Sequence, residues 1–215
     1  MLSLKQFDVE LHRLQEEDLE LVRSWRNEAY ISNQMIYRAF ISEEMQRNWF
    51  QTINNAQNYY FIIVFKGHKV GLINAKDYNS EKGFGEGGIF IGDKDYEDSF
   101  AAVFASLCLL NFVYYLLPHI TTSRIRVLKT NIRAIQYNKL IGYEEIPGAA
   151  NSFDQLFELT RARYLIHGLK LNKVASLYCE GSNLMTLSGT PSDINIPEIN
   201  NLLEAKILPM AIPGL

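Results

Sequence analysis

The pattern of hydrophobic and polar positions predicts that the chain alternates between strands and helices. Short runs that are apolar throughout, or at every second position, are typical of strands, whereas apolar residues three and four positions apart are typical of helices. The expected strands are residues 7–14, 59–65, 70–75, 88–91, 123–127, 143–146 and 155–159. The expected helices begin at Gln15 and Ser42 and span 99–117, 131–141, 161–177 and 199–207.

Signals at the ends of these elements support the same division. Ser42 is a good N-cap, and Gly142 is a good residue to follow a helix C-terminus. Residues 181–197 are rich in Gly, Ser, Thr, Asn and Pro, which predicts a loop. The element order predicts one mixed α/β (α+β) sheet with helices on both faces. The buried face of the second helix is expected to hold Met45, Trp49, Phe50 and Ile53.

Composition narrows the range of partners. Of the 215 residues 47% are apolar and 21% are charged, and the net charge is −3, so no basic field favours nucleic acid. Neither a membrane-spanning run nor a secretory signal is evident, which predicts a cytoplasmic protein. Cys108 and Cys179 lie far apart and predict neither a disulfide framework nor a metal site, and Cys108 is expected to be a small buried hydrophobe.

The most informative stretch runs from Gly85 to Phe112. It predicts a buried strand, a short turn and a long apolar helix, an arrangement that can aim a helix N-terminus at a phosphate. The turn, however, holds Glu97, Asp98 and Phe100 where a phosphate-binding turn favours glycine.

The element order and several phrases together resemble the GNAT superfamily of acetyl-CoA-dependent N-acetyltransferases. The phrases are LVRSWRN (21–27), ISEEMQRNWF (41–50), EGGIFIGDKDY (86–96), VLKTNIRAIQYNKLIGY (127–143) and FELTRARY (157–164). They are similar in particular to the bacterial subgroup that acetylates amino sugars on nucleotide carriers, or protein N-termini. The resemblance implies a GNAT-like domain over residues 1–165. Residues 166–215 are too apolar for a solvated tail, so we expect this extension to pack on the domain or on a second subunit.

The resemblance also implies a site for acetyl-CoA, with no metal. In the family two parallel strands splay apart where pantetheine enters, and the strand that ends at Ile91 would offer it backbone groups. The turn at 97–102 would wrap the pyrophosphate, and Asn131 would bond the cofactor arm. The implied cofactor-binding residues are Ile91, Ser99, Ala101, Ala102 and Asn131.

The turn departs from the family pattern at Asp98, Phe100 and Ala102, which stand where glycine or another small residue is usual. The Asp98 carboxylate is suited to cap the following helix, which would fill the anion site with the protein's own anion. Glu97 adds a second charge that would repel a pyrophosphate. Phe100 needs space in a tight turn. Two interpretations stay open: a well-capped helix start, or a rearranged turn that still binds CoA.

The implied general base is Glu86, because many family members keep a carboxylate near the acceptor amine. The alternative is an exposed acidic residue at a strand edge. The family tyrosine that protonates the leaving thiolate aligns best with Asn138, with Tyr137 one residue earlier, and asparagine cannot act as an acid. Asn131 could equally be a simple helix cap.

Arg26 and Asn27 end the first helix and are expected near the acceptor groove. Arg26 suits a phosphate of a nucleotide-linked sugar, since guanidinium binds phosphate in a bidentate manner; the alternative is a surface arginine. Two functions remain open. One is an N-acetyltransferase that acts on a primary amine such as an amino sugar by direct attack, for which a homo-oligomer is one expected form. The other is a non-catalytic binding or assembly module that has lost the CoA loop.

Overall fold

The computed structural model describes residues 2–79, 83–117, 119–149, 151, 153–189 and 201. The strands are β1 Ser3–Gln6, β2 Val9–Arg13, β3 Tyr59–Phe65, β4 His68–Asn79, β5 Phe84–Ile91, β6 Thr122–Leu128, β7 Glu144–Glu145, β8 Asp154–Thr160 and β9 Thr186–Ser188. The helices are α1 Leu19–Asn27, α2 Ala29–Ser32, α3 Glu43–Ile53, α4 Ala101–Asn111, α5 Ile132–Ile141 and α6 Arg161–Tyr178. Shorter helical turns are η1 Glu16–Asp18, η2 Lys94–Tyr96 and the π-helical η3 Phe112–Leu116.

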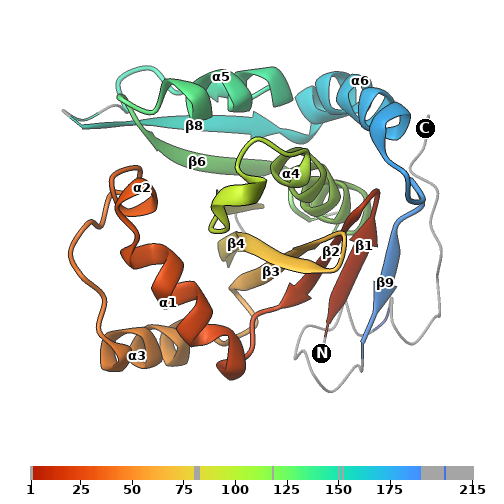
Figure 1. Ribbon diagram of the computed structural model, residues 1–215. Helices are drawn as coiled ribbons and strands as arrows, with labels where there is room; N and C mark the ends of the chain where they lie inside the picture. The colour runs from red at the N-terminus through yellow and green to blue at the C-terminus, as the bar shows by residue number, and fades with distance from the viewer. Residues whose placement is uncertain are drawn as a thin grey trace.

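The strands of the described ranges form one sheet, in the order β7-β8-β6-β5-β4-β3-β2-β1-β9. Neighbouring strands are antiparallel except β5 and β6, which run parallel. Figure 1 shows α5 and α6 along β6 and β8, and α1 to α3 beside β3 and β4. The predicted mixed sheet with flanking helices is confirmed.

The parallel strands β5 and β6 diverge soon after they meet. In the described residues their pairing ends at Glu86 and Arg124. Beyond that point β5 stays paired with β4 as far as Ile91, while β6 stays paired with β8 as far as Leu128. The sheet therefore separates into two halves, and the edge of β5 after Glu86 has lost its partner strand.

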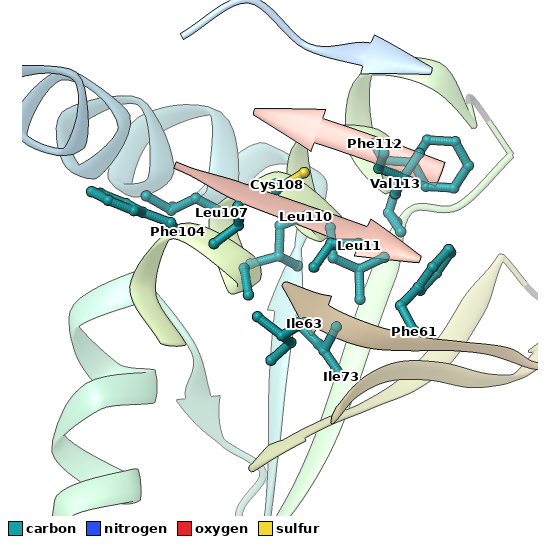
Figure 2. Packing of buried hydrophobic residues seen from close by; sticks show 14 of the residues in the cluster. Leu11, Phe61, Ile63, Ile73, Phe104, Leu107, Cys108, Leu110, Phe112 and Val113 are labelled. Carbon is teal, nitrogen blue, oxygen red and sulfur yellow. The ribbon is translucent and has the colours of Figure 1, made fainter. Parts of the chain in front are cut away.

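Helix α4 forms the centre of the main core. Most of its residues are buried, because the helix is apolar on all sides and can only be stable inside the protein. Figure 2 shows Leu107 and Leu110 of this helix close to Leu11 and Ile63 of the sheet, and all four belong to one buried cluster. Cys108 is fully buried in the same cluster, as expected, and burial raises the pKa of its thiol.

A smaller cluster anchors α1 to the opposite face of the sheet. Val22 and Trp25 of α1 pack with Ile62 of β3 and Leu72 of β4. Their spacing along α1 gives the helix an apolar stripe, as the sequence predicts. This contact places the end of α1 beside the carboxyl end of β5, where Trp25 meets Phe90 edge to face at 6.4 Å.

The pattern misses two strands at one end of the sheet, β1 and β9. It predicts one strand over residues 7–14, but the chain turns at Phe7, whose φ is 57°, and β1 and β2 form a hairpin. It predicts a loop over residues 181–197, but Thr186–Ser188 pairs with β1. β9 lies at the edge of the sheet and pairs with β1, which is distant in sequence, so its own residues carry only a weak strand pattern. The expected helix at 199–207 lies outside the described residues, apart from Asn201.

The segment after β8 is tied to the rest of the fold by buried amides. Asn111 of α4 donates to Gln6 of β1 at 2.9 Å and to Asn172 of α6 at 2.7 Å. The Tyr164 hydroxyl donates to the side-chain Oδ1 of Asn111 at 2.7 Å. Because buried polar groups are costly unless paired, this network fixes how α6 sits on α4.

Candidate functional site

A cavity of about 1090 Å³ opens where β5 and β6 diverge. Its walls come from the facing edges of β5 and β6, from β3 and β4, from the helices α1 and α3 with the segment between them, and from α4 and α5. Since the ends of parallel strands meet at one edge of a sheet, such a divergence is a usual place for a ligand.

The cavity brings most of the sequence-predicted site residues together. Asn27 and Ala101 do not line it: the Asn27 amide bonds both backbone groups of Ile41, at 2.9 and 2.8 Å, and Ala101 is buried in the core. The predicted residues in its wall are Arg26, Glu86, Ile91, Ser99, Ala102 and Asn131.

Glu86 is the last residue of β5 that pairs with β6, and the divergence begins there. Its carboxylate forms an ion pair with Lys76 of β4 at 3.0 Å, and its side chain is 34% exposed. The next residue is Gly87, where an added Cβ would lie 3.4 Å from Ile125 of β6 and 3.6 Å from the Ser123 hydroxyl. Glycine therefore keeps the space beside Glu86 open between the strands.

The turn after β5 contacts one residue of α1 and one of α2. A Cβ at Gly92 would lie 2.2 Å from the Trp25 ring, so only glycine lets α1 approach this closely. The Tyr30 hydroxyl also donates to the Gly92 carbonyl oxygen. These two contacts fix where the chain leaves β5 and so where α4 begins.

The expectation that Asp98 caps α4 is wrong. The N-cap residue of α4 is Phe100, which makes no side-chain cap bond, and the Ser99 hydroxyl accepts from the Ala101 amide at 3.2 Å. The Asp98 carboxylate instead accepts from Arg133 of α5 at 2.9 Å and is 92% exposed. Among the described residues, therefore, no carboxylate caps the N-terminus of α4.

Arg133 also contacts the other acidic residue of the turn. Its guanidinium lies 3.4 Å from the Glu97 carboxylate and donates to the Glu97 carbonyl oxygen at 3.0 Å. One cation therefore contacts both carboxylates and offsets one of the two negative charges that were expected to repel a pyrophosphate. The sequence gives little warning of this contact, because Arg133 lies 35 and 36 positions after its partners.

Phe100 does not obstruct the turn. Its ring is 48% exposed and stacks on Phe104, at 5.6 Å, and on Tyr178 of α6, at 5.3 Å. The expected steric conflict is avoided because the ring packs along α4 and against α6. Phe100 does not line the cavity.

On α5, Asn131 caps the helix, since its side-chain oxygen accepts from the Ala134 amide at 3.0 Å. The Tyr137 hydroxyl donates to the Ala102 carbonyl oxygen at 3.1 Å, and burial raises its pKa. Asn138, the position aligned with the family tyrosine, donates to the Ala134 carbonyl oxygen at 2.8 Å. Tyr137 and Asn138 both line the cavity.

The α1 and α3 end of the cavity contains a residue that the sequence analysis missed. Gln46 is 4% exposed and lines the cavity, while Met45, expected in the buried face of α3, is 42% exposed. Gln46 precedes Trp49, Phe50 and Ile53 by three, four and seven positions, and this helical spacing could have revealed it.

Tyr60 of β3 links this end of the cavity to Glu86. Its ring packs edge to face on Trp49 at 5.1 Å. Burial raises the pKa of Tyr60 to about 12, with smaller upward contributions from Asp77 and Glu86 and a downward one from Arg26. Arg26 and Glu86 therefore both lie within electrostatic range of one hydroxyl.

Metal-binding clusters and membrane-spanning helices are both missing from the described part of the chain. No group of three or more His, Cys, Asp or Glu side chains is placed to hold a metal ion there. None of the helices that the structure describes has the length and apolar character to span a membrane.

Comparison with known proteins gives one family and several solved structures. A protein-family model described as an acetyltransferase (GNAT) domain matches residues 8–144. No curated protein matches. One similar structure is a domain from Methanocaldococcus jannaschii, with 19% identity, a TM-score of 0.64, and coverage of 72% of this chain and 99% of that one.

Two other similar structures have named activities. One is apo FdhC, a nucleotide-linked sugar GNAT, with 20% identity, a TM-score of 0.64, and coverage of 83% of this chain and 98% of that one. The other is spermidine N-acetyltransferase from Vibrio cholerae in complex with CoA and spermine, with 17% identity, a TM-score of 0.62, and coverage of 74% and 98%. At these identities the likeness shows a shared fold.

Proposed function

Because the chain belongs to the GNAT family of acetyltransferases, whose domain matches residues 8–144, we propose that it transfers an acetyl group from acetyl-CoA to a primary amine. The observation that carries this proposal is the open divergence of β5 and β6, with the carboxylate of Glu86 at its inner end. Acetyl transfer requires a cavity that holds the thioester and the amine together, with a base beside the amine.

The residues around the divergence fit CoA. The edge of β5 from Gly87 to Ile91 has no partner in β6, so its backbone groups are free to pair with the amides of pantetheine. The start of α4 carries no side-chain cap from Phe100, which leaves first-turn amides near Ala102 for a pyrophosphate. Ser99 and Asn131 line the same space.

Arg133 makes this arrangement compatible with an acidic turn. Glu97 and Asp98 would otherwise raise the cost of binding a polyanion at the start of α4. Their shared pairing with Arg133 halves the net negative charge of the turn, which lowers the repulsion where the helix amides can act.

In the proposed reaction Glu86 is the general base. It takes a proton from the acceptor ammonium, directly or through water, and frees the nitrogen lone pair. The nitrogen attacks the thioester carbonyl carbon, so that a C–N bond forms and the C–S bond breaks, without a covalent enzyme intermediate. Lys76, at 3.0 Å from Glu86, holds the carboxylate at the inner end of the divergence.

We place the acceptor at the α1 and α3 end, with Arg26 in its wall and Asn27 supporting the segment that closes it. A nucleotide-linked amino sugar is the acceptor we favour, because the cavity is large and carries a cation at this end. The likeness to a nucleotide-linked sugar GNAT is consistent with this choice. We also propose that residues 1–165 form the catalytic domain and that 166–215 is its extension.

Titration calorimetry with acetyl-CoA tests the proposal. Binding at the divergence should release heat and raise the melting temperature, and a ligand at 100 times its Kd contributes about 2.7 kcal/mol. The control is Gly87→Leu, which fills the space between the strands and should abolish the heat. If the wild type gives neither heat nor a thermal shift, the protein is the non-catalytic module instead.

A further inference from the structure

The acceptor end of the cavity contains two buried donors that no described group satisfies. The Nε atom of Arg26 and the Nε2 atom of Gln46 are inaccessible to solvent and have no hydrogen-bond partner. Both residues line the cavity, one from α1 and the other from α3. Buried donors are nearly always paired in folded proteins, so two unpaired ones in one cavity indicate a ligand that supplies acceptor oxygens.

Arg26 also carries the unbalanced charge of this cavity. In the described residues its guanidinium makes one hydrogen bond, to the Tyr37 carbonyl oxygen at 3.3 Å. On the same two helices Arg23 pairs with Glu20 at 2.6 Å, and Arg47 pairs with Glu43. Among the residues that the structure describes, Arg26 has no such carboxylate, and arginine stays charged even where burial lowers its pKa.

The other charges in the described wall are compensated. Their pairs are Lys76 with Glu86, Arg126 with Asp154, and Arg133 with Glu97. The described wall thus offers a free cation and no free carboxylate. A polyamine, which needs several carboxylates, has no counter-charge here.

The position of Arg26 relative to Glu86 suits a single small molecule. Both residues line the same cavity as Tyr60 and Trp49, whose rings pack edge to face at 5.1 Å. An acceptor lying along these rings would bring its amine to Glu86 and its other end to Arg26 and Gln46.

We infer that the acceptor is an amine that also carries an anionic group, a phosphate or a carboxylate, and that Arg26 and Gln46 bind this group. The inference rests on the proposed acetyl transfer for its kinetic readout. Arg26 supplies charge and a planar pair of donors, and Gln46 supplies a neutral donor from the facing helix. Gln46 is the specificity residue that the sequence did not reveal.

The test uses three sugars that share one amine. Glucosamine carries no anion, glucosamine 6-phosphate carries a phosphate and muramic acid carries a carboxylate; spermidine is the cationic comparison. Thiol release from acetyl-CoA should give at least one anionic sugar a kcat/KM roughly tenfold or more above that of glucosamine, as expected for a charge-assisted bond. The better anionic sugar identifies phosphate or carboxylate. Equal values for glucosamine, or a higher value for spermidine, would overturn the inference.

Substitutions at Arg26 and Gln46 test whether these two residues cause the preference for an anionic sugar. Arg26→Gln should reduce the ratio of anionic to neutral kcat/KM by about tenfold. Gln46→Leu should reduce the same ratio without lowering the melting temperature, because it removes an unpaired buried donor. Arg47→Gln, an exposed arginine next to Gln46, is the control and should change neither quantity. If Arg26→Gln lowers both rates equally, the anionic contact is refuted.

Separate measurements of sugar binding and acetyl-CoA binding distinguish this inference from the proposed acetyl transfer. At fixed ionic strength the better anionic sugar should raise the melting temperature of the wild type, and Arg26→Gln should lose the shift. A shift without acetyl-CoA binding would reject acetyl transfer and keep the anion site. Heat from acetyl-CoA with no shift from either anionic sugar would keep acetyl transfer and reject the anion site.

Discussion

Among single residues, Glu86 has the most direct consequence for activity. It stands where β5 and β6 separate, with glycine on either side and Lys76 at 3.0 Å. Glu86→Gln keeps the shape of the site but removes the base. We expect turnover to fall by about 10² to 10⁴, while the Kd for acetyl-CoA stays unchanged.

The matched control for this prediction is Glu44→Gln, an exposed carboxylate on α3. It should alter neither turnover nor cofactor binding. Steady-state kinetics combined with calorimetry measure both quantities. A Glu86→Gln enzyme with wild-type turnover across the pH range would remove Glu86 from the mechanism.

Asp154 predicts how stability depends on pH. Burial raises the pKa of this carboxyl, but hydrogen bonds from Arg126 and Asn151 outweigh burial and lower it below 3.8. A lowered folded-state pKa gives stability that is present above the unfolded pKa and is lost as the pH falls through the folded pKa. The pair spans 2.7 Å, and Asp154 is 4% exposed.

Asp154→Asn should therefore lower the free energy of unfolding by about 1 to 3 kcal/mol at pH 7. The difference between variant and wild type should shrink as the pH falls below about 4. Urea unfolding at several pH values measures this. A difference that stays constant between pH 7 and pH 3 would contradict the assignment of the effect to the ionised carboxylate.

Among elements, the turn between β5 and α4 depends on α5. Arg133 pairs with Glu97 and Asp98, and all three side chains are substantially exposed, so these ion pairs contribute at most about 1 kcal/mol to folding. Arg133→Gln should leave the melting temperature nearly unchanged. It should weaken acetyl-CoA binding by roughly three- to tenfold, because two carboxylates then face the pyrophosphate without a counter-charge.

A thermodynamic cycle gives this prediction its control. Glu97→Gln with Asp98→Asn should tighten binding, and adding Arg133→Gln to that pair should have little further effect. If Arg133→Gln is equally harmful with and without the two acids, Arg133 acts on the cofactor itself and the charge-balance argument fails.

The same elements show what a sequence pattern can and cannot predict. The apolar run 59–65 and the largely apolar α4 were predictable, because burial on every side leaves few polar positions. The role of Asp98 was not, because a carboxylate just before a helix is typically its cap and the competing Arg133 is distant in sequence. Gln46 has the helical spacing of the buried face of α3 and could have been placed there, but a polar side chain is typical of an exposed position.

In the whole molecule, the two ends of the cavity belong to different parts of the fold. The proposed cofactor end is built by β5, β6, α4 and α5, and the proposed acceptor end by α1, α3 and the segment between them. α4 joins these parts to the segment after β8, because it packs against the sheet on one side and against α6 on another. The stability of α4 therefore bears on where the site lies.

The last prediction concerns that connection. Ending the chain after Arg163 removes α6, so Asn111 and Gln6 lose Asn172 and Tyr164 from their buried network. Each orphaned group costs about 1 to 3 kcal/mol, which corresponds to roughly 2 to 12 °C in melting temperature for a chain of this size. Ending the chain after Cys179 keeps α6 but removes β9, so the difference between the two shortened chains reports on α6 alone. We expect the melting temperature to fall in the order full chain, chain to Cys179, chain to Arg163. Equal melting temperatures for the two shortened chains would show that α6 does not support α4.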